Sequence, residues 1–209
     1  EGVSGANNAG KAPFFGSIAT KVTGARQPGM PAHVAVPYGM SIGLRPGYFG
    51  GNYLGVHHNP FETDGDPNAE NFQVRNVGLS QGLTLDRLSD RRALLTSMDS
   101  LRREADTSGM FEAMDKFDRT AFDMVTGART RDAFDLSKED PKTRELYGRH
   151  SWGQSTLLAR RLVEAGTTFV SCHFGGWDHH WDLKSGYDNY LPKIDQLVYG
   201  LITDLSDRG

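Results

Sequence analysis

The spacing of apolar side chains along the chain predicts mainly helices, separated by stretches rich in glycine and proline. Apolar residues recur every three to four positions, the period of one helical face. A long amphipathic helix is predicted from about Leu191. Its expected inward side chains are Ile194, Leu197, Val198, Leu201, Ile202 and Leu205. The predicted helices cover residues 13–24, 84–106, 110–125, 130–136, 141–148, 152–165 and 191–208.

Two stretches have the composition of β-strands. Residues 32–37 form a short apolar run between two prolines. Residues 167–174 are rich in β-branched and aromatic side chains, which favour strands. The stretch 38–82 has no usable period and is predicted to be loop. Two strands do not make a self-sufficient sheet, so further strands are expected from outside this chain.

The chain is interpreted as one incomplete α/β domain over residues 1–209. Residues 1–82 are rich in glycine and aromatic side chains and are expected to be ordered but irregular. Residues 83–148 form a mainly helical middle region. Residues 149–209 form a helix–strand–helix unit, and this unit indicates the α/β class.

Composition and charge narrow the classes of function. The chain has 209 residues, with 23 Lys and Arg, 26 Asp and Glu, and a net charge of −3. This balance gives no electrostatic reason to expect a nucleic-acid or anionic-membrane partner. No apolar run approaches the ~18 residues that cross a bilayer, so no membrane span is predicted. The single cysteine, Cys172, lies in a predicted strand and is interpreted as a buried apolar residue rather than a nucleophile.

The main candidate for chemistry is the motif Gly-Gly-Trp-Asp-His-His at residues 175–180, directly after a predicted strand. Ligand sites of open α/β sheets gather at the carboxyl ends of strands. Asp178 and His180 lie two residues apart, so their side chains can converge on a divalent ion such as Zn²⁺ or Mn²⁺. Such an ion polarises an ester oxygen and lowers the pKa of a bound water or hydroxyl. Nearby alternatives are His179, His173 and Asp182.

A structural interpretation of the same residues stays open. An aspartate after a strand often caps the following turn, and a histidine beside aromatic residues is often a hydrogen-bonded surface group. Zinc sites also need three or four protein ligands, which two residues cannot supply. His150, at a helix entrance, is interpreted as structural, with a site-lining role as the alternative. Residues 64–68 match a calcium loop in composition but lack its full spacing, which indicates a polar turn.

Several stretches of the chain resemble a family known as domain of unknown function 1501. The likeness covers nearly the whole chain and includes residues 83–88, 90–95, 133–141, 147–150, 158–166, 175–178 and 204–209. The family's usual turn is Gly-Trp-Asp-Thr-His. This chain has His179 in place of the threonine, while Asp178 and His180 keep their places.

The family is similar to the alkaline phosphatase and sulfatase superfamily. The resemblance therefore implies that the chain is a segment of a three-layer, metal-dependent α/β fold. It implies that Asp178 and His180 bind a divalent ion, Zn²⁺, Mn²⁺ or Ca²⁺, and that the protein is periplasmic or secreted. The nucleophile and the remaining ligands are expected outside this chain, because the family's further acidic, His, Glu-Phe-Gly-Arg and Arg-Asp-His-Trp motifs do not occur in it.

Two functions follow as hypotheses. The first is a metal-dependent hydrolase of phosphate or sulfate esters, with a small-molecule ester or a polysaccharide as substrate. The second is a non-catalytic exported protein that keeps the fold and binds carbohydrate or a protein partner, which the aromatic content of residues 1–82 favours. A Ser, Thr or Cys beside an aspartate, at the end of an early strand of the longer parent sequence, would favour the hydrolase.

Overall fold

A short parallel sheet forms the centre of the chain. The computed structural model describes residues 12–39, 49–74, 77, 86–87, 89–90, 93 and 121–209. Three strands lie in the order β2–β1–β3, all parallel. Their bounds are His33–Val36 for β1, Phe61–Glu62 for β2 and Phe169–Cys172 for β3. The described residues therefore form a mixed α/β structure, as predicted.

Strand β1 corresponds to the predicted strand at residues 32–37, and β3 to the one at residues 167–174. All four residues of β1 are buried, which is typical of a parallel strand covered on both faces. The strands pair over their whole length, with Val34 opposite Val170. Both predicted strands are thus confirmed.

The prediction that residues 38–82 are loop is wrong at β2. This strand pairs with Val34 and Ala35 and gives the sheet a third strand, where only two were expected. Two residues are too few to show the alternation that identifies a strand in a sequence. Two short 3₁₀ helices also lie in this stretch, η3 at Asn52–Leu54 and η4 at Val56–His58.

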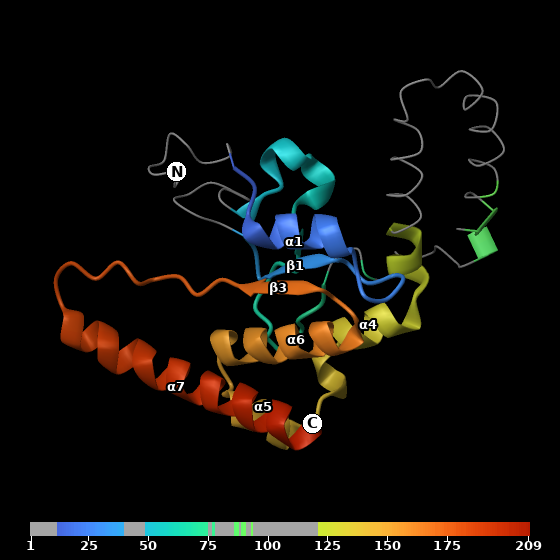
Figure 1. The fold of residues 1–209 in the computed structure, drawn as a ribbon. Coiled ribbons are helices and arrows are strands. Elements are labelled where there is room, and N and C mark those ends of the chain that lie inside the picture. The colour runs from blue at the N-terminus through green and yellow to red at the C-terminus, as the bar shows by residue number, and fades with distance from the viewer. Residues whose placement is uncertain are drawn as a thin grey trace.

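Helices cover both faces of the sheet (Figure 1). Helix α1, Phe15–Thr23, is the predicted first helix and lies on one face, and α6, Ser151–Ala165, lies on the other. Both helices contact β1 and β3. The apolar core side chains that are almost completely buried are Met30, Val34, Val36, Tyr147, Leu157, Leu158 and Leu162. The described residues thus form a helix layer, a sheet and a second helix layer.

Predicted helix ends near Gly148 are confirmed. Helix α5 spans Pro141–Tyr147. Asp140 caps it, because its side chain accepts a hydrogen bond from the Lys142 N–H at 2.6 Å. Gly148 (φ 95°) and Gly166 (φ 117°) end α5 and α6 in conformations that favour glycine.

The short helix predicted at residues 130–136 is confirmed as α4, Ala128–Phe134, and a 3₁₀ helix, η5, follows it at Leu136–Lys138. Of the predicted helices at residues 84–106 and 110–125, the structure describes residues 86–87, 89–90, 93 and 121–125, and all of these are helical. The remaining parts of these two predicted helices lie outside the described residues, so the prediction is not tested there.

Helix α7, Leu183–Arg208, begins about two turns before the predicted start at Leu191. The Asp182 side chain caps it by accepting a hydrogen bond from the Ser185 N–H at 3.0 Å. Pro192 lies inside the helix. The predicted start was wrong because the cap at Asp182 was not recognised.

Only part of the predicted inner face of α7 is buried. Leu197 is 4% exposed, whereas Val198, Ile202 and Leu205 are 43%, 64% and 51% exposed. One side of α7 packs on α5 and α6, and the other faces away from them (Figure 1). The prediction that all six apolar side chains point inward is therefore wrong.

A buried network of ion pairs joins η5, α6 and α7. Arg160 lies at its centre and pairs with Glu139 and Asp204, each at 2.8 Å. Arg161 also pairs with Glu139, at 2.9 Å. Tyr147 donates a hydrogen bond to Asp204, at 2.9 Å. The network fixes the C-terminal half of α7 against α6.

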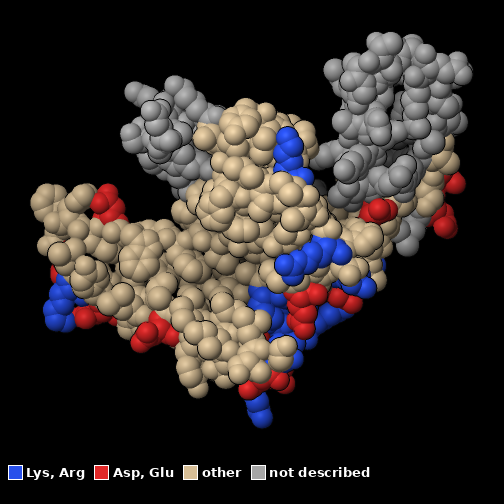
Figure 2. All heavy atoms as spheres, viewed as in Figure 1, with Lys and Arg blue, Asp and Glu red and all other residues tan. Residues whose placement is uncertain are grey.

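Charged side chains of both signs are mixed on the surface. On the face that Figure 2 shows, Lys and Arg alternate with Asp and Glu around α4 and the end of α6. None of the described helices is long and apolar enough to cross a membrane.

Candidate functional site

The carboxyl ends of the three parallel strands meet at one edge of the sheet, and the candidate motif leaves from this edge. Residues 173–182, which we call the strap, extend β3 beyond the sheet before α7 turns back (Figure 1). The His173 N–H still donates to the Val36 carbonyl at 2.8 Å. The motif therefore lies on an extended segment that projects beyond the sheet.

Asp178 and His180 touch each other on the outer side of the strap. The Oδ1 atom of Asp178 lies 2.8 Å from Nε2 of His180. A turn hydrogen bond from the His179 N–H to the Trp177 carbonyl, at 3.0 Å, spans Asp178. The two side chains converge, as their spacing predicts. They do not lie in a cleft of the described residues, because they are 84% and 68% exposed.

Alternate side chains of the strap face opposite sides. Trp177 and His179 face α7, with ring centres 5.4 Å and 5.2 Å from that of Tyr190. Asp178 and His180 face outward. Such alternation is the rule in extended backbone. Because Trp177 and His179 pack against α7, Asp178 and His180 are the residues that face outward.

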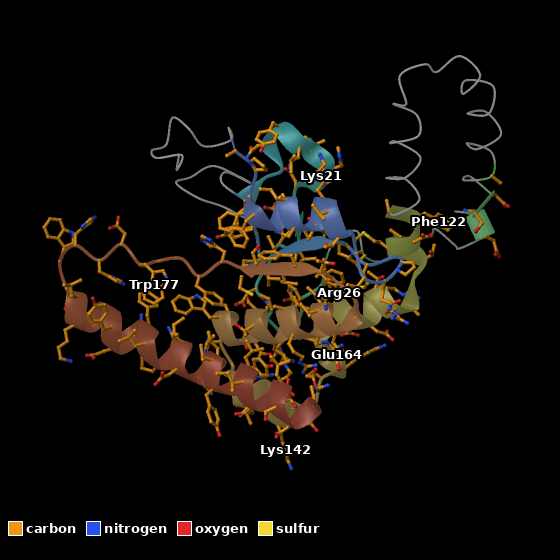
Figure 3. The ribbon with its side chains drawn as sticks, in the orientation of Figure 1. Lys21, Arg26, Phe122, Lys142, Glu164 and Trp177 are labelled. Carbon is orange, nitrogen blue, oxygen red and sulfur yellow. The ribbon has the colours of Figure 1, made fainter. Side chains whose placement is uncertain are left out.

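Four aromatic rings hold the strap against α6 and α7. We call them the aromatic clasp: Trp152, Phe174, Trp177 and Tyr190. Trp152, in the first turn of α6, stacks on Tyr190 of α7 with ring centres 4.9 Å apart and planes at 11°. Phe174 and Trp177 of the strap stack on Trp152 at 5.3 Å and 5.7 Å. Figure 3 shows Trp177 between the strap and α7.

Two glycines permit this close packing. A Cβ atom on Gly176 would lie 2.5 Å from the Tyr190 hydroxyl oxygen. A Cβ atom on Gly186, in the first turns of α7, would lie 2.8 Å from the nearest atom of the His179 ring. Both separations are shorter than carbon atoms tolerate. Gly176 and Gly186 thus let the strap approach α7.

Three other predicted site residues have structural contacts. His150 caps α6, because its Nδ1 accepts a hydrogen bond from a first-turn N–H at 3.1 Å. Burial lowers the pKa of His150, and the charge of Lys193 lowers it further, which favours the neutral ring that accepts this bond. Asp182 caps α7. The His173 ring packs on Tyr38, with ring centres 5.4 Å apart.

The structure brings only Asp178 and His180 together among the predicted site residues. His179 lies on the opposite side of the strap, and its buried Nε2 has no hydrogen-bond partner among the described residues. Within the same residues, no group of three or more His, Cys, Asp or Glu side chains could hold a metal ion. The described residues therefore bring one carboxylate oxygen and one imidazole nitrogen together, but no third side chain that could complete a metal site.

Cys172 behaves as an apolar strand residue. Burial raises the pKa of its thiol to about 12, so the thiol stays protonated at neutral pH. Its Sγ lies 3.6 Å from the Ser155 carbonyl oxygen, to which it donates. Only the thiolate is a strong nucleophile, which supports the sequence interpretation.

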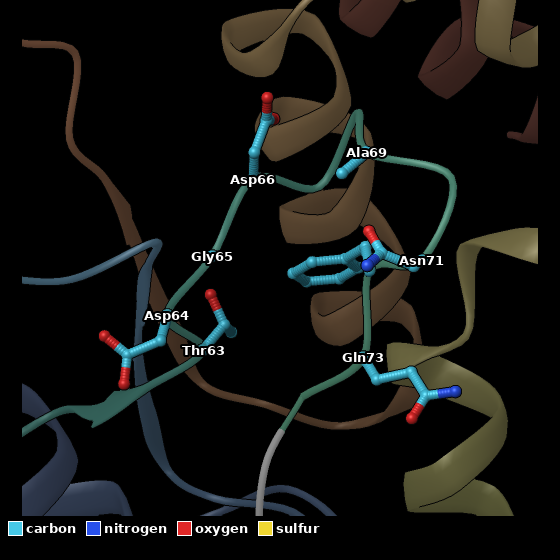
Figure 4. Close-up of a pocket in the computed structure, with 8 residues that line it drawn as sticks. Thr63, Asp64, Gly65, Asp66, Ala69, Asn71 and Gln73 are labelled. Atoms are coloured by element: carbon cyan, nitrogen blue, oxygen red, sulfur yellow. The ribbon is translucent and has the colours of Figure 1, made fainter.

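A cavity of about 440 Å³ lies beside the carboxyl end of β2 (Figure 4). Its lining consists of Thr63, Asp64, Gly65, Asp66, Ala69, Asn71, Phe72 and Gln73. In Figure 4, the carboxylates of Asp64 and Asp66 point in different directions, and Asp66 accepts a hydrogen bond from the Asn68 N–H at 2.8 Å. The carboxylates do not converge, and the polar turn predicted at residues 64–68 is confirmed.

Sequence reasoning missed the residues that position the pair, namely Trp152, Gly186 and Tyr190. The predicted start of α7 at Leu191 left Gly186 and Tyr190 in a loop. The sequence did contain a signal for these residues. Asp182 is a typical N-cap residue, and a helix that begins after it places Gly186 and Tyr190, four residues apart, on one face.

A family model described as "Protein of unknown function (DUF1501)" matches residues 3–209. The match includes the strap and all four residues of the aromatic clasp. The chain matches no curated protein and no solved structure.

Proposed function

The chain belongs to the DUF1501 family, and we propose that it carries part of the active site of a metal-dependent hydrolase of phosphate or sulfate esters. The observation that carries this proposal is the 2.8 Å contact between Asp178 and His180 on the outer side of the strap. The strap leaves the carboxyl edge of a parallel sheet, the edge at which open α/β sheets bind ligands.

The two side chains suit a divalent metal ion. Carboxylate oxygen and imidazole nitrogen bind Zn²⁺ at about 2.0–2.2 Å, so two ligands of a tetrahedral ion lie about 3.3 Å apart. The reacting atoms of Asp178 and His180 are 2.8 Å apart and exposed, so a small opening would admit the ion. Mn²⁺ and Ca²⁺ also accept carboxylate ligands.

Each residue has a defined role in this proposal. A bound ion would polarise the ester oxygen and lower the pKa of an attacking water or hydroxyl. Asp178 would supply negative charge and an oxygen ligand to this ion, and His180 would supply its Nε2 nitrogen. The aromatic clasp holds both in place from the inner side of the strap. The nucleophile and the further ligands come from parts of the protein other than the described residues.

The proposal assigns the three layers to a fold of the alkaline phosphatase and sulfatase type. It is supported by the parallel sheet with helices on both faces and by the placement of the Asp178–His180 pair beyond a strand. The substrate is proposed to be a small-molecule ester or a polysaccharide. The protein is proposed to be periplasmic or secreted.

One observation favours a second candidate, a non-catalytic exported protein that binds carbohydrate or another protein. Large apolar side chains lie exposed on the outer side of α1 and on the adjacent 3₁₀ helices: Phe15, Ile18, Val22, Tyr53 and Val56. Surfaces of this kind mark interaction sites in many proteins. Metal binding at Asp178 distinguishes the hydrolase from this candidate.

The proposal is tested by the metal content of full-length Asp178→Asn and His180→Ala variants. Each variant is dialysed against Zn²⁺ and against Mn²⁺, and bound metal is measured by mass spectrometry. We expect at least a tenfold loss of metal affinity in each variant. The Asn amide oxygen is a poorer ligand than the Asp178 carboxylate, and His180→Ala removes the imidazole ligand altogether. Hydrolysis of p-nitrophenyl phosphate and sulfate is expected to fall with the metal content.

Asp188→Asn is the matched control, since Asp188 is exposed near the start of α7 and pairs with Lys184. It removes the same charge close to the strap and should leave metal content unchanged. Equal metal binding by the wild-type, Asp178→Asn and His180→Ala proteins would refute the ligand role and favour the binding protein.

A further inference from the structure

A histidine is buried between α1 and the sheet. His33 is the first residue of β1, at the edge of the sheet opposite to the strap, and is 4% exposed. Its ring stacks on Phe14, which directly precedes α1, with ring centres 5.7 Å apart and planes at 17°. Phe169 of β3 makes an edge contact with the same ring at 5.4 Å, and Ser17 Oγ of α1 lies 3.5 Å from His33 Nδ1. His33 is therefore part of the contact that joins α1 to the sheet.

Helix α1 depends on this contact for its stability. It has nine residues, and helices shorter than about 12 residues are marginal in water without packing. Its buried residues are small, namely Gly16, Ser17 and Thr20. A Cβ atom on Gly16 would lie 2.7 Å from the Phe169 ring, so the helix lies as close to β3 as its backbone allows. Any change that weakens the contact at His33 and Phe169 therefore weakens α1.

The described elements around His33 supply no negative charge. None of α1, β1, β3 and η4 contains an Asp or Glu residue. Their other titratable side chains are Lys21 on α1, Cys172 on β3, and His57 and His58 on η4. Lys21 is exposed, and Cys172 donates to a carbonyl of α6 on the opposite face of the sheet. A protonated His33 ring would therefore be a buried charge without a carboxylate from these elements beside it, which is strongly unfavourable.

The protonation state of His33 is coupled to this packing. Burial lowers the pKa of His33 from 6.5 to about 4, and a backbone contact at His58 opposes this effect only in part. The buried Nε2 atom has no hydrogen-bond partner among the described residues. The packed state therefore holds the neutral ring, whereas a solvated imidazole takes up a proton near pH 6.5. The stability of the contact is fully present above about pH 6.5 and is lost as the pH falls toward 4.

We infer that protonation of His33 releases α1 from the sheet in mildly acidic solution, so that the chain contains a pH-sensitive conformational switch. In the released state the charged ring of His33 reaches water, and the rings of Phe14 and Phe169 lose their shared contact. The inference is independent of the proposed hydrolase, because His33 lies at the edge of the sheet opposite to Asp178 and His180. It needs neither a metal ion nor a substrate.

Hydrogen exchange of the full-length protein tests this inference. Exchange of the α1 amides is measured by mass spectrometry at about pH 7 and about pH 4.5, with correction for the intrinsic pH dependence of amide exchange. We expect the protection of α1 to fall at least tenfold at the lower pH, because the released state binds a proton that the packed state excludes. Protection of α6 should stay unchanged, since Glu139 and Asp204 of its ion-pair network have lowered pKa values and keep their charge.

His33→Phe keeps an aromatic ring in place and removes the titratable group, so α1 should stay protected at both pH values. His57→Gln is the matched control, because His57 is an exposed imidazole on η4, and this variant should lose protection as the wild type does. No loss in the wild type, an equal loss in His33→Phe, or an equal loss in α6 would overturn the inference. So would an NMR titration of the wild-type protein in which His33 takes up its proton near pH 6.5 while α1 stays protected.

Discussion

At the scale of single residues, Glu139 is a strong determinant of stability in the described structure. Its carboxylate is 8% exposed and pairs with Arg160 and Arg161. Replacement by Gln leaves two guanidinium groups with a neutral partner in a buried place. We expect Glu139→Gln to lower the free energy of unfolding by roughly 3 kcal/mol, the cost of breaking a buried ion pair. Urea denaturation followed by far-UV circular dichroism measures this change.

Glu145→Gln provides the comparison for that substitution. Glu145 is 70% exposed and pairs with Arg149 across one turn of α5 at 3.6 Å. Exposed pairs of this kind contribute below about 1 kcal/mol. Similar losses of stability in Glu139→Gln and Glu145→Gln would contradict a special role for the buried network.

The same network makes stability depend on pH. Burial alone would raise the pKa of Glu139, but hydrogen bonds and charge from Arg161 and Arg160 outweigh it and lower the pKa. For Asp204, burial is likewise outweighed by bonds from Arg208 and Tyr147 and by the charge of Arg160. A lowered pKa gives stability that is present above the unfolded value of about 4 and is lost as pH falls through the folded value. We expect the urea concentration at the unfolding midpoint to decrease as the pH is lowered below about 4. The decrease should be less steep in Glu139→Gln than in the wild-type protein. Parallel profiles for both proteins would contradict this origin.

At the scale of elements, the junction between the strap and α7 positions the candidate site. Gly186 lies against His179 so closely that an added Cβ would stand 2.8 Å from the ring. In a helix, a Gly→Ala substitution normally raises the free energy of unfolding by about 1 kcal/mol. Any decrease of the free energy of unfolding in Gly186→Ala therefore reports the close contact with the strap. We expect a weaker near-UV circular dichroism signal from the stacked rings and at least a tenfold loss of metal affinity. Far-UV circular dichroism should stay unchanged.

Ser185→Ala is the control for this junction, because it adds no bulk against the strap and lies in the same helical turn. It should keep both the near-UV signal and the metal affinity. A Gly186→Ala protein with wild-type values of both would show that the contact with His179 does not position Asp178 and His180.

Elements with explicit end signals were the most predictable from sequence. Asp140, Gly148 and Gly166 each satisfy a local backbone requirement, so their positions follow from residue type alone. Strand β2 was missed because its two residues pair through contacts distant in sequence. The start of α7 was missed because the capping aspartate at residue 182 was not recognised as the signal that begins the helix.

The candidate site shows the same division between local and distant information. The spacing of Asp178 and His180 predicted their convergence, since extended backbone turns every second residue to one side. The stacking of Trp152 on Tyr190 joins two helices and depends on the angle at which they pack. Sequence spacing contains no information about that angle.

At the scale of the whole molecule, two apolar surfaces stay uncovered within the described structure. One runs along α7 through Leu191, Val198, Ile202 and Leu205. The other lies over α1, where Figure 2 shows a surface with few charged side chains. We expect the chain to bind 8-anilinonaphthalene-1-sulfonate, a dye that reports exposed apolar surface. The double variant Ile202→Lys and Leu205→Lys should reduce the fluorescence at least twofold.

Asp207→Asn is the control for this double variant. It also makes the net charge more positive, but on the opposite side of α7, and should leave the dye fluorescence unchanged. Absence of dye binding by the wild-type chain would contradict the exposed surface on α7. It would indicate that another segment or a second copy of the chain covers this face.

The central claim, that Asp178 and His180 bind one metal ion, is tested most directly by anomalous X-ray scattering. Crystals of the full-length protein grown with Zn²⁺ are measured on both sides of the zinc absorption edge. We expect one anomalous peak within about 2.0–2.2 Å of an Asp178 carboxylate oxygen and of His180 Nε2. A fully occupied zinc peak elsewhere, with Asp178 and His180 bonded only to each other, would contradict it.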